Sequence, residues 1–171
     1  MRSRFDWDCY FMTMAYLVAA KSKDPSTKVG AVIVGSDKEV RSTGYNGLPR
    51  GLQDTFERYE RPLKYQIGNH AEENAILNCC RIGVSTKGCI LYVPWSPCSL
   101  CAKSIIQAGI IKVIYHREWP GNNSNDTSWL ASIQLAADMF RETGVDLHEY
   151  SGPLVKITGF YHEQEFMVDQ E

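Results

Sequence analysis

Residues 88–116 read GCILYVPWSPCSLCAKSIIQAGIIKVIYH. The stretch begins and ends with short apolar runs, Gly88–Pro94 and Lys112–His116, which are typical of buried strands. Residues 99–108, between them, favour a helix. Because strands that alternate with helices indicate an α/β sheet, this stretch predicts an α/β fold.

The same alternation extends in both directions from this stretch. Further helices are predicted at residues 6–21, 70–81 and 129–143, and further strands at residues 30–34, 40–45 and 145–150. Residues 36–38 favour a hairpin turn between the first two strands. A hairpin followed by alternating strands and helices predicts a mixed sheet covered by helices on both faces.

Two segments carry weaker patterns. Residues 52–68 mix polar and aromatic side chains without a clean period, so we expect a loop with room for one short helix. Residues 151–171 are expected to be a C-terminal tail that either docks or frays. The prediction is one domain over residues 1–171, with its core at about residues 6–150.

Composition excludes several classes of protein. Of 171 residues, 22% are charged and 44% are hydrophobic, which is typical of a folded globular domain and not of a disordered chain. The formal net charge of −2 argues against a general basic surface for long nucleic acid. No run approaches the roughly 18 apolar residues of a membrane span, and the apolar stretch at residues 11–20 lacks the flanks of a signal peptide. We therefore expect a cytoplasmic protein without a membrane partner.

The sequence has six cysteines, at positions 9, 79, 80, 89, 98 and 101. Without a secretion signal, a reducing compartment is expected, where clustered cysteines more often bind metal or act in catalysis than form disulfides.

Two short motifs carry the chemistry: His70-Ala71-Glu72 and Pro97-Cys98-Ser99-Leu100-Cys101. H-x-E followed by P-C-x-x-C is the established signature of zinc nucleobase deaminases. His70, Cys98 and Cys101 make three ligands, and a catalytic zinc uses three protein ligands and keeps one position open. Glu72 lies two residues after His70, where its carboxylate can move a proton without binding the metal.

Each half of this pattern, taken alone, also fits a different kind of site. A thioredoxin-like role for Cys98 and Cys101 leaves His70 and Glu72 without a function. A structural zinc site would need a fourth ligand from Cys79, Cys80 or Cys89, and we interpret all three as buried small hydrophobic residues.

Further stretches resemble the deoxycytidylate deaminase family. Residues 24–34 resemble its first hairpin, residues 44–51 its GYNG loop and residues 70–76 its HAExNAI helix, and the spacing through residues 107–110 also fits. The resemblance covers about residues 6–150. It implies the cytidine-deaminase-like fold, a three-layer α/β/α sandwich with a mixed five-stranded sheet.

The resemblance also implies an activity and its regulation. It implies hydrolysis of dCMP to dUMP and ammonia, which supplies dUMP for thymidylate synthesis, with His70, Cys98 and Cys101 holding zinc and Glu72 transferring protons. It implies a homo-oligomer, commonly a hexamer, that dCTP activates and dTTP inhibits. A regulatory triphosphate usually arrives with Mg²⁺, which stabilises its negative charge. Some relatives carry a second, structural zinc, but residues 52–69 contain neither Cys nor His, so one zinc per chain is predicted.

By position, the resemblance assigns substrate contacts. Lys28, with Ser26 or Thr27, suits the 5′-phosphate, and Asn46 would bind the nucleotide, although a turn residue beside Gly47 is a competing interpretation. Trp119 either stacks on the substrate or packs a loop, and core packing is the favoured role of Tyr115. The remaining candidate substrate contacts are Ala71 and Ser96. The candidate effector contacts are Asn46, Gly47, Leu48, Arg50 and Arg81.

Three other functions remain open. A tRNA adenosine deaminase shares both motifs, but the GYNG loop and Asn74 disfavour it. The net charge of −2 also disfavours it, because a tRNA-binding protein usually has a basic patch. A dCTP deaminase would differ only in its phosphate site. A zinc-stabilised binding module without activity has no need for Glu72, which plays no part in holding the metal.

Overall fold

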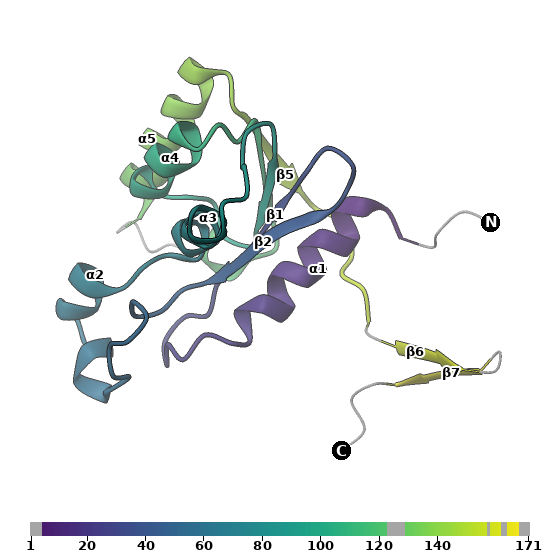
Figure 1. Ribbon diagram of the computed structural model, residues 1–171, viewed down its shortest axis with the longest axis horizontal. Helices are drawn as coiled ribbons and strands as arrows, with labels where there is room; N and C mark the ends of the chain where they lie inside the picture. Colours follow the sequence, from purple (N-terminus) through teal and green to yellow (C-terminus); the bar gives the residue numbers. More distant parts are fainter. Residues whose placement is uncertain (1–4, 123–128, 157, 162–163, 168–171) are drawn as a thin grey trace.

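The structure, a computed structural model, describes residues 5–122, 129–156, 158–161 and 164–167, with side chains up to residue 156 (Figure 1). The helices are α1 (Trp7–Ala19), α2 (Leu63–Ile67), α3 (Ala71–Ile82), α4 (Ser99–Gln107) and α5 (Leu130–Thr143), with the 3₁₀ turns η1 (Phe56–Tyr59) and η2 (Pro120–Asn122). The strands are β1 (Gly30–Val34), β2 (Val40–Tyr45), β3 (Ile90–Val93), β4 (Lys112–His116), β5 (Asp146–Tyr150), β6 (Thr158–Tyr161) and β7 (Gln164–Met167).

The first five strands form one mixed sheet in the order β2-β1-β3-β4-β5. Strand β1 pairs antiparallel with both β2 and β3, whereas β3, β4 and β5 run parallel to one another. The parallel pairs are joined by α4 and α5, as parallel connections require a crossover. The predicted mixed five-stranded sheet is confirmed.

Alternate side chains of the strands face two separate hydrophobic clusters. On β1, Ala31 and Ile33 join buried residues of α3, α4 and α5, while Val32 and Val34 pack against α1. Figure 1 shows α1 on one side of the sheet and α3, α4 and α5 on the opposite side. The molecule therefore has the expected three layers.

Two glycines let the helices pack directly on the hairpin. A Cβ atom at Gly30 would lie 2.2 Å from the carbonyl oxygen of Ala15 on α1, and one at Gly44 would lie 2.2 Å from the amide nitrogen of Ala75 on α3. Because real Cβ atoms do not approach backbone this closely, both positions require glycine. The close approach at Gly44 fixes α3 against the edge of the sheet.

Backbone constraints explain where predicted and observed bounds differ. The predicted strand at residues 88–94 is shorter in the structure, because Gly88 adopts a φ of 76° and Pro94 has no N–H to pair. The segment at residues 52–68, predicted to hold one short helix, contains both η1 and α2.

The first part of the C-terminal segment docks on α1. The Val155 amide donates to Thr13 Oγ1 at 2.9 Å, and the Pro153 carbonyl accepts from Tyr150 Oη at 2.7 Å. Beyond it, β6 and β7 pair antiparallel as a separate hairpin. Within the described part of the chain, no helix is long and apolar enough to cross a membrane.

Candidate active site

Two helices begin at the same end of the sheet, and each begins at a residue of the sequence motifs. His70 is the N-cap of α3 and Cys98 is the N-cap of α4, both with extended backbone. The His70 Nδ1 atom lies 3.5 Å from Cys98 Sγ and 3.3 Å from Cys101 Sγ. The structure therefore brings His70 together with two cysteines that follow it by 28 and 31 positions in the sequence.

This group has the donor set and the spacing of a metal site. The ligand atoms of His70, Cys98 and Cys101 all lie within 4.8 Å of one another. Among the described residues, these three side chains form the cluster of potential metal ligands. Tetrahedral zinc with Zn–N and Zn–S bonds of about 2.0 and 2.3 Å would hold its N and S ligands about 3.5 Å apart. The observed N–S distances fit this value, and three ligands leave a fourth position open.

Hydrogen bonds within the group separate the pKa values of its members. The pKa of Cys98 is lowered to about 4, because the Cys101 thiol and the His70 ring both donate to it. The hydrogen bond with Cys98 raises the pKa of His70 to about 9. Cys98 is therefore held as the thiolate, the form in which cysteine binds metal.

Glu72 lies in the first turn of α3 beside this group. Glu72 is only 5% exposed, and burial raises its pKa above the usual range. A carboxyl group that is buried beside a metal site, and is not one of its ligands, is suited to accept and release a proton. We call His70, Glu72, Cys98 and Cys101 the cavity floor; of these four, His70, Glu72 and Cys98 line the cavity itself.

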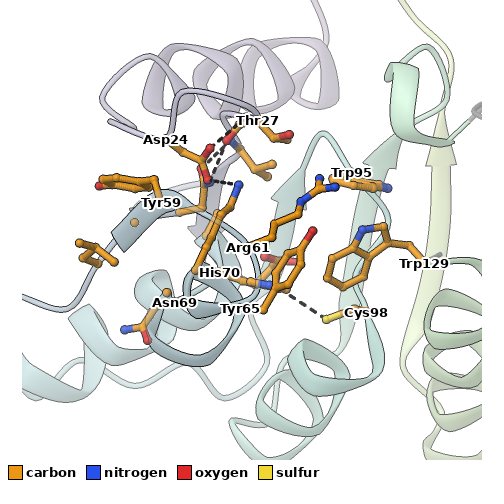
Figure 2. A pocket seen from close by; sticks show the side chains of 18 of the residues that line it. Asp24, Thr27, Tyr59, Arg61, Tyr65, Asn69, His70, Trp95, Cys98 and Trp129 are labelled. Atoms are coloured by element: carbon orange, nitrogen blue, oxygen red, sulfur yellow. Dashed lines mark hydrogen bonds and ion pairs between the residues drawn. The ribbon is translucent and has the colours of Figure 1, made fainter. Parts of the chain in front are cut away.

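The floor opens into a cavity of about 200 Å³ (Figure 2). Its lining residues come from the loop after α1, the loop after β2, the segment that includes α2, the starts of α3 and α4, and the start of α5. The polar and charged lining residues outside the floor include Asp24, Thr27, Asn46, Tyr59, Arg61, Lys64, Asn69 and Ser96. The cavity therefore offers charged and polar groups at some distance from the metal ligands.

One side of the cavity is formed by Tyr59, Arg61, Lys64 and Tyr65, which we call the cavity wall. An ion pair ties this wall to the loop after α1: Lys64 Nζ lies 2.6 Å from Asp24 Oδ2. Lys64 Nζ also donates to Ser26 Oγ at 2.6 Å. The side chains of Lys64 and Asp24 are 15% and 3% exposed, so solvent screens this ion pair weakly.

Asp24 organises the loop that it belongs to. It accepts hydrogen bonds from the Ser26 amide and hydroxyl and from the Thr27 amide. Burial alone would raise the pKa of Asp24, but the hydrogen bonds from Lys64, Ser26 and Thr27 outweigh it and hold the pKa below its usual value. Asn46 completes the network, because its side-chain amide donates to the Thr27 carbonyl at 2.9 Å and accepts from the Val29 amide at 2.8 Å.

Aromatic rings connect the wall to the floor. The Trp129 ring lies 5.9 Å from the rings of His70, Tyr65 and Trp95, measured between centroids. Figure 2 shows Trp129 and Tyr65 side by side near Cys98. These rings form an apolar surface next to the metal-ligating group, as a site that holds a flat base requires.

The structure places the predicted site residues in three positions. Those that line the cavity besides the floor are Thr27, Asn46, Gly47, Leu48, Ala71 and Ser96. Lys28 and Ser26 are exposed and are not among the lining residues. Tyr115 donates to Glu149 at 3.1 Å, and Trp119 packs beside Trp95.

The two predicted effector arginines lie away from the cavity. Arg50 Nη2 donates to Asn78 Oδ1 at 2.6 Å on the outer side of α3, and Arg81 is exposed near the end of that helix. The amide of Asn46 is used within the loop network, which is a structural role. Its backbone is not left-handed, because Lys38 is the non-glycine residue with a positive φ in the described part of the chain, and direct contact of Asn46 with a nucleotide stays a prediction.

Sequence reasoning missed the whole cavity wall and its anchor, Asp24. Lys64 and Tyr65 lie six and five residues before His70, in a stretch without helical or strand period. Asp24 stands in a Pro-containing turn, where an acidic residue ordinarily caps the local backbone. The one available signal was the mixture of cations and aromatic residues at positions 58–65, because such a mixture is unusual in a plain surface loop.

The cysteines outside the floor are free thiols, as are Cys98 and Cys101. Cys9, Cys79 and Cys89 are buried in the hydrophobic clusters, as small apolar side chains are. The interpretation of Cys80 as buried is wrong: it lies on α3 and is exposed.

Comparisons with known proteins agree with this geometry. The sequence pattern described as "Cytidine and deoxycytidylate deaminase zinc-binding region" matches residues 5–117. The chain is 40% identical over 143 residues to the deoxycytidylate deaminase of Mus musculus, covering 80% of this chain and 79% of that protein, and 39% identical to that of Homo sapiens over the same shares.

A solved structure shows the same fold. The dCMP deaminase of cyanophage S-TIM5 in complex with dCMP and dUMP superposes with a TM-score of 0.63 at 26% identity, covering 82% of this chain and 94% of that one. Pattern, sequence identity and fold agree along most of the chain. The chain therefore belongs to the family of zinc-binding cytidine and deoxycytidylate deaminases.

Proposed function

We propose that the chain catalyses the hydrolytic deamination of dCMP, in which dCMP and water give dUMP and ammonia. The observation that carries the proposal is Glu72, a buried carboxyl group beside a His/Cys/Cys group that it does not complete. A binding module would not need this group at the bottom of an open cavity. The names of the Mus musculus and Homo sapiens relatives and the nucleotides bound in the cyanophage enzyme support dCMP as the substrate.

In this proposal, His70, Cys98 and Cys101 hold the zinc ion. Bound there, zinc supplies a Lewis acid that makes a water molecule acidic near neutral pH. The Glu72 carboxylate accepts the proton of the water that attacks C4 of the cytosine ring. It delivers that proton to N3, and a further proton transfer lets the amino group leave as ammonia.

The burial of Glu72 suits both halves of this cycle. A carboxyl group with a raised pKa holds the transferred proton longer than an exposed one, and can release it to a ring nitrogen without loss to bulk water. Trp129 and Tyr65 provide flat apolar surface for the base, and with Trp95 they limit the access of solvent to the reacting atoms.

The regulatory part of the proposal rests on the resemblance. We propose that dCTP with Mg²⁺ activates the enzyme, that dTTP inhibits it, and that the chain forms a hexamer in the cytoplasm, where dUMP feeds thymidylate synthesis. Gly47 and Leu48 would link an effector site to the cavity, because they line the cavity and continue into the loop that carries Arg50. Saturating dCTP is expected to convert sigmoidal dCMP kinetics into hyperbolic kinetics, and unaltered curves would dismiss this regulation.

The test of the proposed function is ammonia release by the purified, zinc-loaded protein. The substrates offered in parallel are dCMP, deoxycytidine, dCTP and a tRNA anticodon stem-loop. We expect kcat/KM to be highest for dCMP. Turnover confined to dCTP or to the RNA would contradict the substrate while keeping the deaminase chemistry, and silence on all four would contradict the proposed activity.

A further inference from the structure

Outside its floor, the cavity holds one positive charge that is not balanced within the described part of the chain. Outside the floor, the cationic side chains among its lining residues are Arg61 and Lys64. Lys64 is neutralised by Asp24 at 2.6 Å, whereas Arg61 forms no ion pair with a described residue. The other acidic lining residue, Glu72, is buried at the floor. An anionic group of a ligand would neutralise the charge of Arg61.

The position of Arg61 places this charge away from the reacting atoms. Its guanidinium carbon lies 5.5 Å from the centre of the Tyr65 ring, and Tyr65 in turn contacts Trp129, which contacts His70. Figure 2 shows the Arg61 side chain pointing along the cavity toward Trp95. Tyr65 and Trp129 therefore connect the guanidinium group to the metal ligand His70 through a chain of ring contacts.

This separation matches the shape of a nucleotide. The amino group on the base and the 5′-phosphate lie at opposite ends of the molecule. A base held at the floor, against the aromatic rings, directs its phosphate toward the wall. The planar guanidinium group can donate two parallel hydrogen bonds to phosphate oxygens, which a point charge such as an ammonium group cannot do.

The other nearby cations are already engaged or lie outside the cavity. Lys23 pairs with Asp54, and Arg58 Nη1 donates to the Gln53 carbonyl at 2.8 Å. Lys28 is exposed and absent from the lining residues. Arg61 is thus the cation that the geometry offers to a ligand in the cavity.

We propose that Arg61 binds the 5′-phosphate of the substrate and thereby makes the enzyme select a nucleotide over a nucleoside. The proposal rests on the proposed function, because it assumes that the base enters at the cavity floor. The Lys64–Asp24 ion pair serves it by holding the wall, and with it Arg61, against the loop after α1.

The experiment compares Arg61→Gln with Arg58→Gln, a matched arginine three residues earlier that does not line the cavity. Calorimetry measures the binding of dUMP and of deoxyuridine to zinc-loaded protein, and steady-state kinetics measure dCMP and deoxycytidine turnover. We expect Arg61→Gln to weaken dUMP binding and kcat/KM for dCMP about 10- to 100-fold, the loss of one charge-assisted contact. In Arg61→Gln, the affinity for deoxyuridine and the kcat/KM for deoxycytidine should change less than about twofold. Arg58→Gln should match the wild type in all four measurements. Arg61→Lys should recover part of the loss in dUMP binding and dCMP turnover.

The outcomes separate this proposal from the proposed function. Equal losses for the nucleotide and the nucleoside would show that Arg61 only supports the wall, and would overturn the proposal while dCMP deamination stands. Wild-type protein that binds dUMP no better than deoxyuridine would overturn it as well. If the wild type has no deaminase activity but binds dUMP in an Arg61-dependent manner, the phosphate site stands and the proposed reaction fails.

Discussion

The floor and the wall of the cavity are built in opposite ways. The floor consists of two helix starts that bring a histidine, a glutamate and two cysteines together within the first turn of α3 and α4. The wall consists of a segment with two short helical turns, and Lys64 ties it to the loop after α1 through one ion pair and one hydrogen bond. Short motifs place the residues of the floor, whereas tertiary contacts place the residues of the wall.

The largest expected effect concerns the floor. Cys98→Ser should lower bound zinc well below one per chain and reduce dCMP turnover by about 1,000-fold or more, because both the metal and the proton transfer that depends on it are lost. Elemental analysis and ammonia release measure the two quantities on the same sample. Cys80→Ser is the matched control, because Cys80 is exposed and should leave both unchanged. Zinc content that persists in Cys98→Ser would remove Cys98 from the ligand set.

A smaller effect is expected where the wall is anchored. Lys64→Met removes the cation that pairs with the buried Asp24, while the remaining donors to Asp24 stay in place. The free energy of unfolding should fall by about 1.5–3 kcal/mol, the cost of losing one hydrogen bond to a buried charged group. Urea unfolding measures it.

Two further variants test whether the loss of stability in Lys64→Met comes from the Lys64–Asp24 ion pair. Lys23→Met, whose ion pair with Asp54 is exposed, should change stability much less than Lys64→Met. In the double variant with Asp24→Asn, the combined loss should be smaller than the sum of the two single losses, because both remove the same interaction. Full additivity would contradict the anchoring role.

The same ion pair predicts a pH dependence of stability. The pKa of Asp24 is lower in the folded protein than its usual value of 3.8, so the unfolded chain binds the proton more readily. This contribution is therefore fully present above about pH 4 and is lost as the pH falls through the folded-state pKa. Between about pH 7 and pH 3, the stability advantage of the wild type over Asp24→Asn should shrink at the acidic end. A constant difference across this range would contradict the pKa direction.

The smallest effect is expected at Lys28, which the sequence assigns to the phosphate and the structure leaves exposed outside the cavity lining. Lys28→Ala should change the KM for dCMP less than about fivefold, as expected for an exposed charge that attracts the substrate only at a distance. Steady-state kinetics of Lys28→Ala and Arg61→Gln, measured in parallel, decide which of the two residues binds the phosphate. A larger effect at Lys28 than at Arg61 would restore the sequence-based assignment.

Most of the fold could be predicted because its periodicity is local. Strand β1 has five consecutive apolar or small residues, and α5 has one apolar stripe followed by Gly144, whose φ of 76° ends the helix. The β6–β7 hairpin was not predicted, because its two short strands follow a stretch without period.

The floor could be predicted because its four residues come from two motifs that keep their spacing on helix starts. Trp129 and Lys64 could not be placed in the cavity from the sequence. Trp129 lies 31 residues after Cys98, and its position depends on how α5 packs beside α4. Lys64 depends on Asp24, which is 40 residues away in the sequence. Such contacts are decided by tertiary packing, and no local pattern reports them.

The central claim is that Glu72 carries out proton transfer at the floor without holding the metal. The most direct test measures zinc content and dCMP turnover together in Glu72→Gln. We predict that zinc remains at one per chain while kcat falls about 10²- to 10⁴-fold, the typical contribution of a general acid–base group. Turnover at the wild-type rate, or a loss of zinc in proportion to the loss of turnover, would contradict the claim.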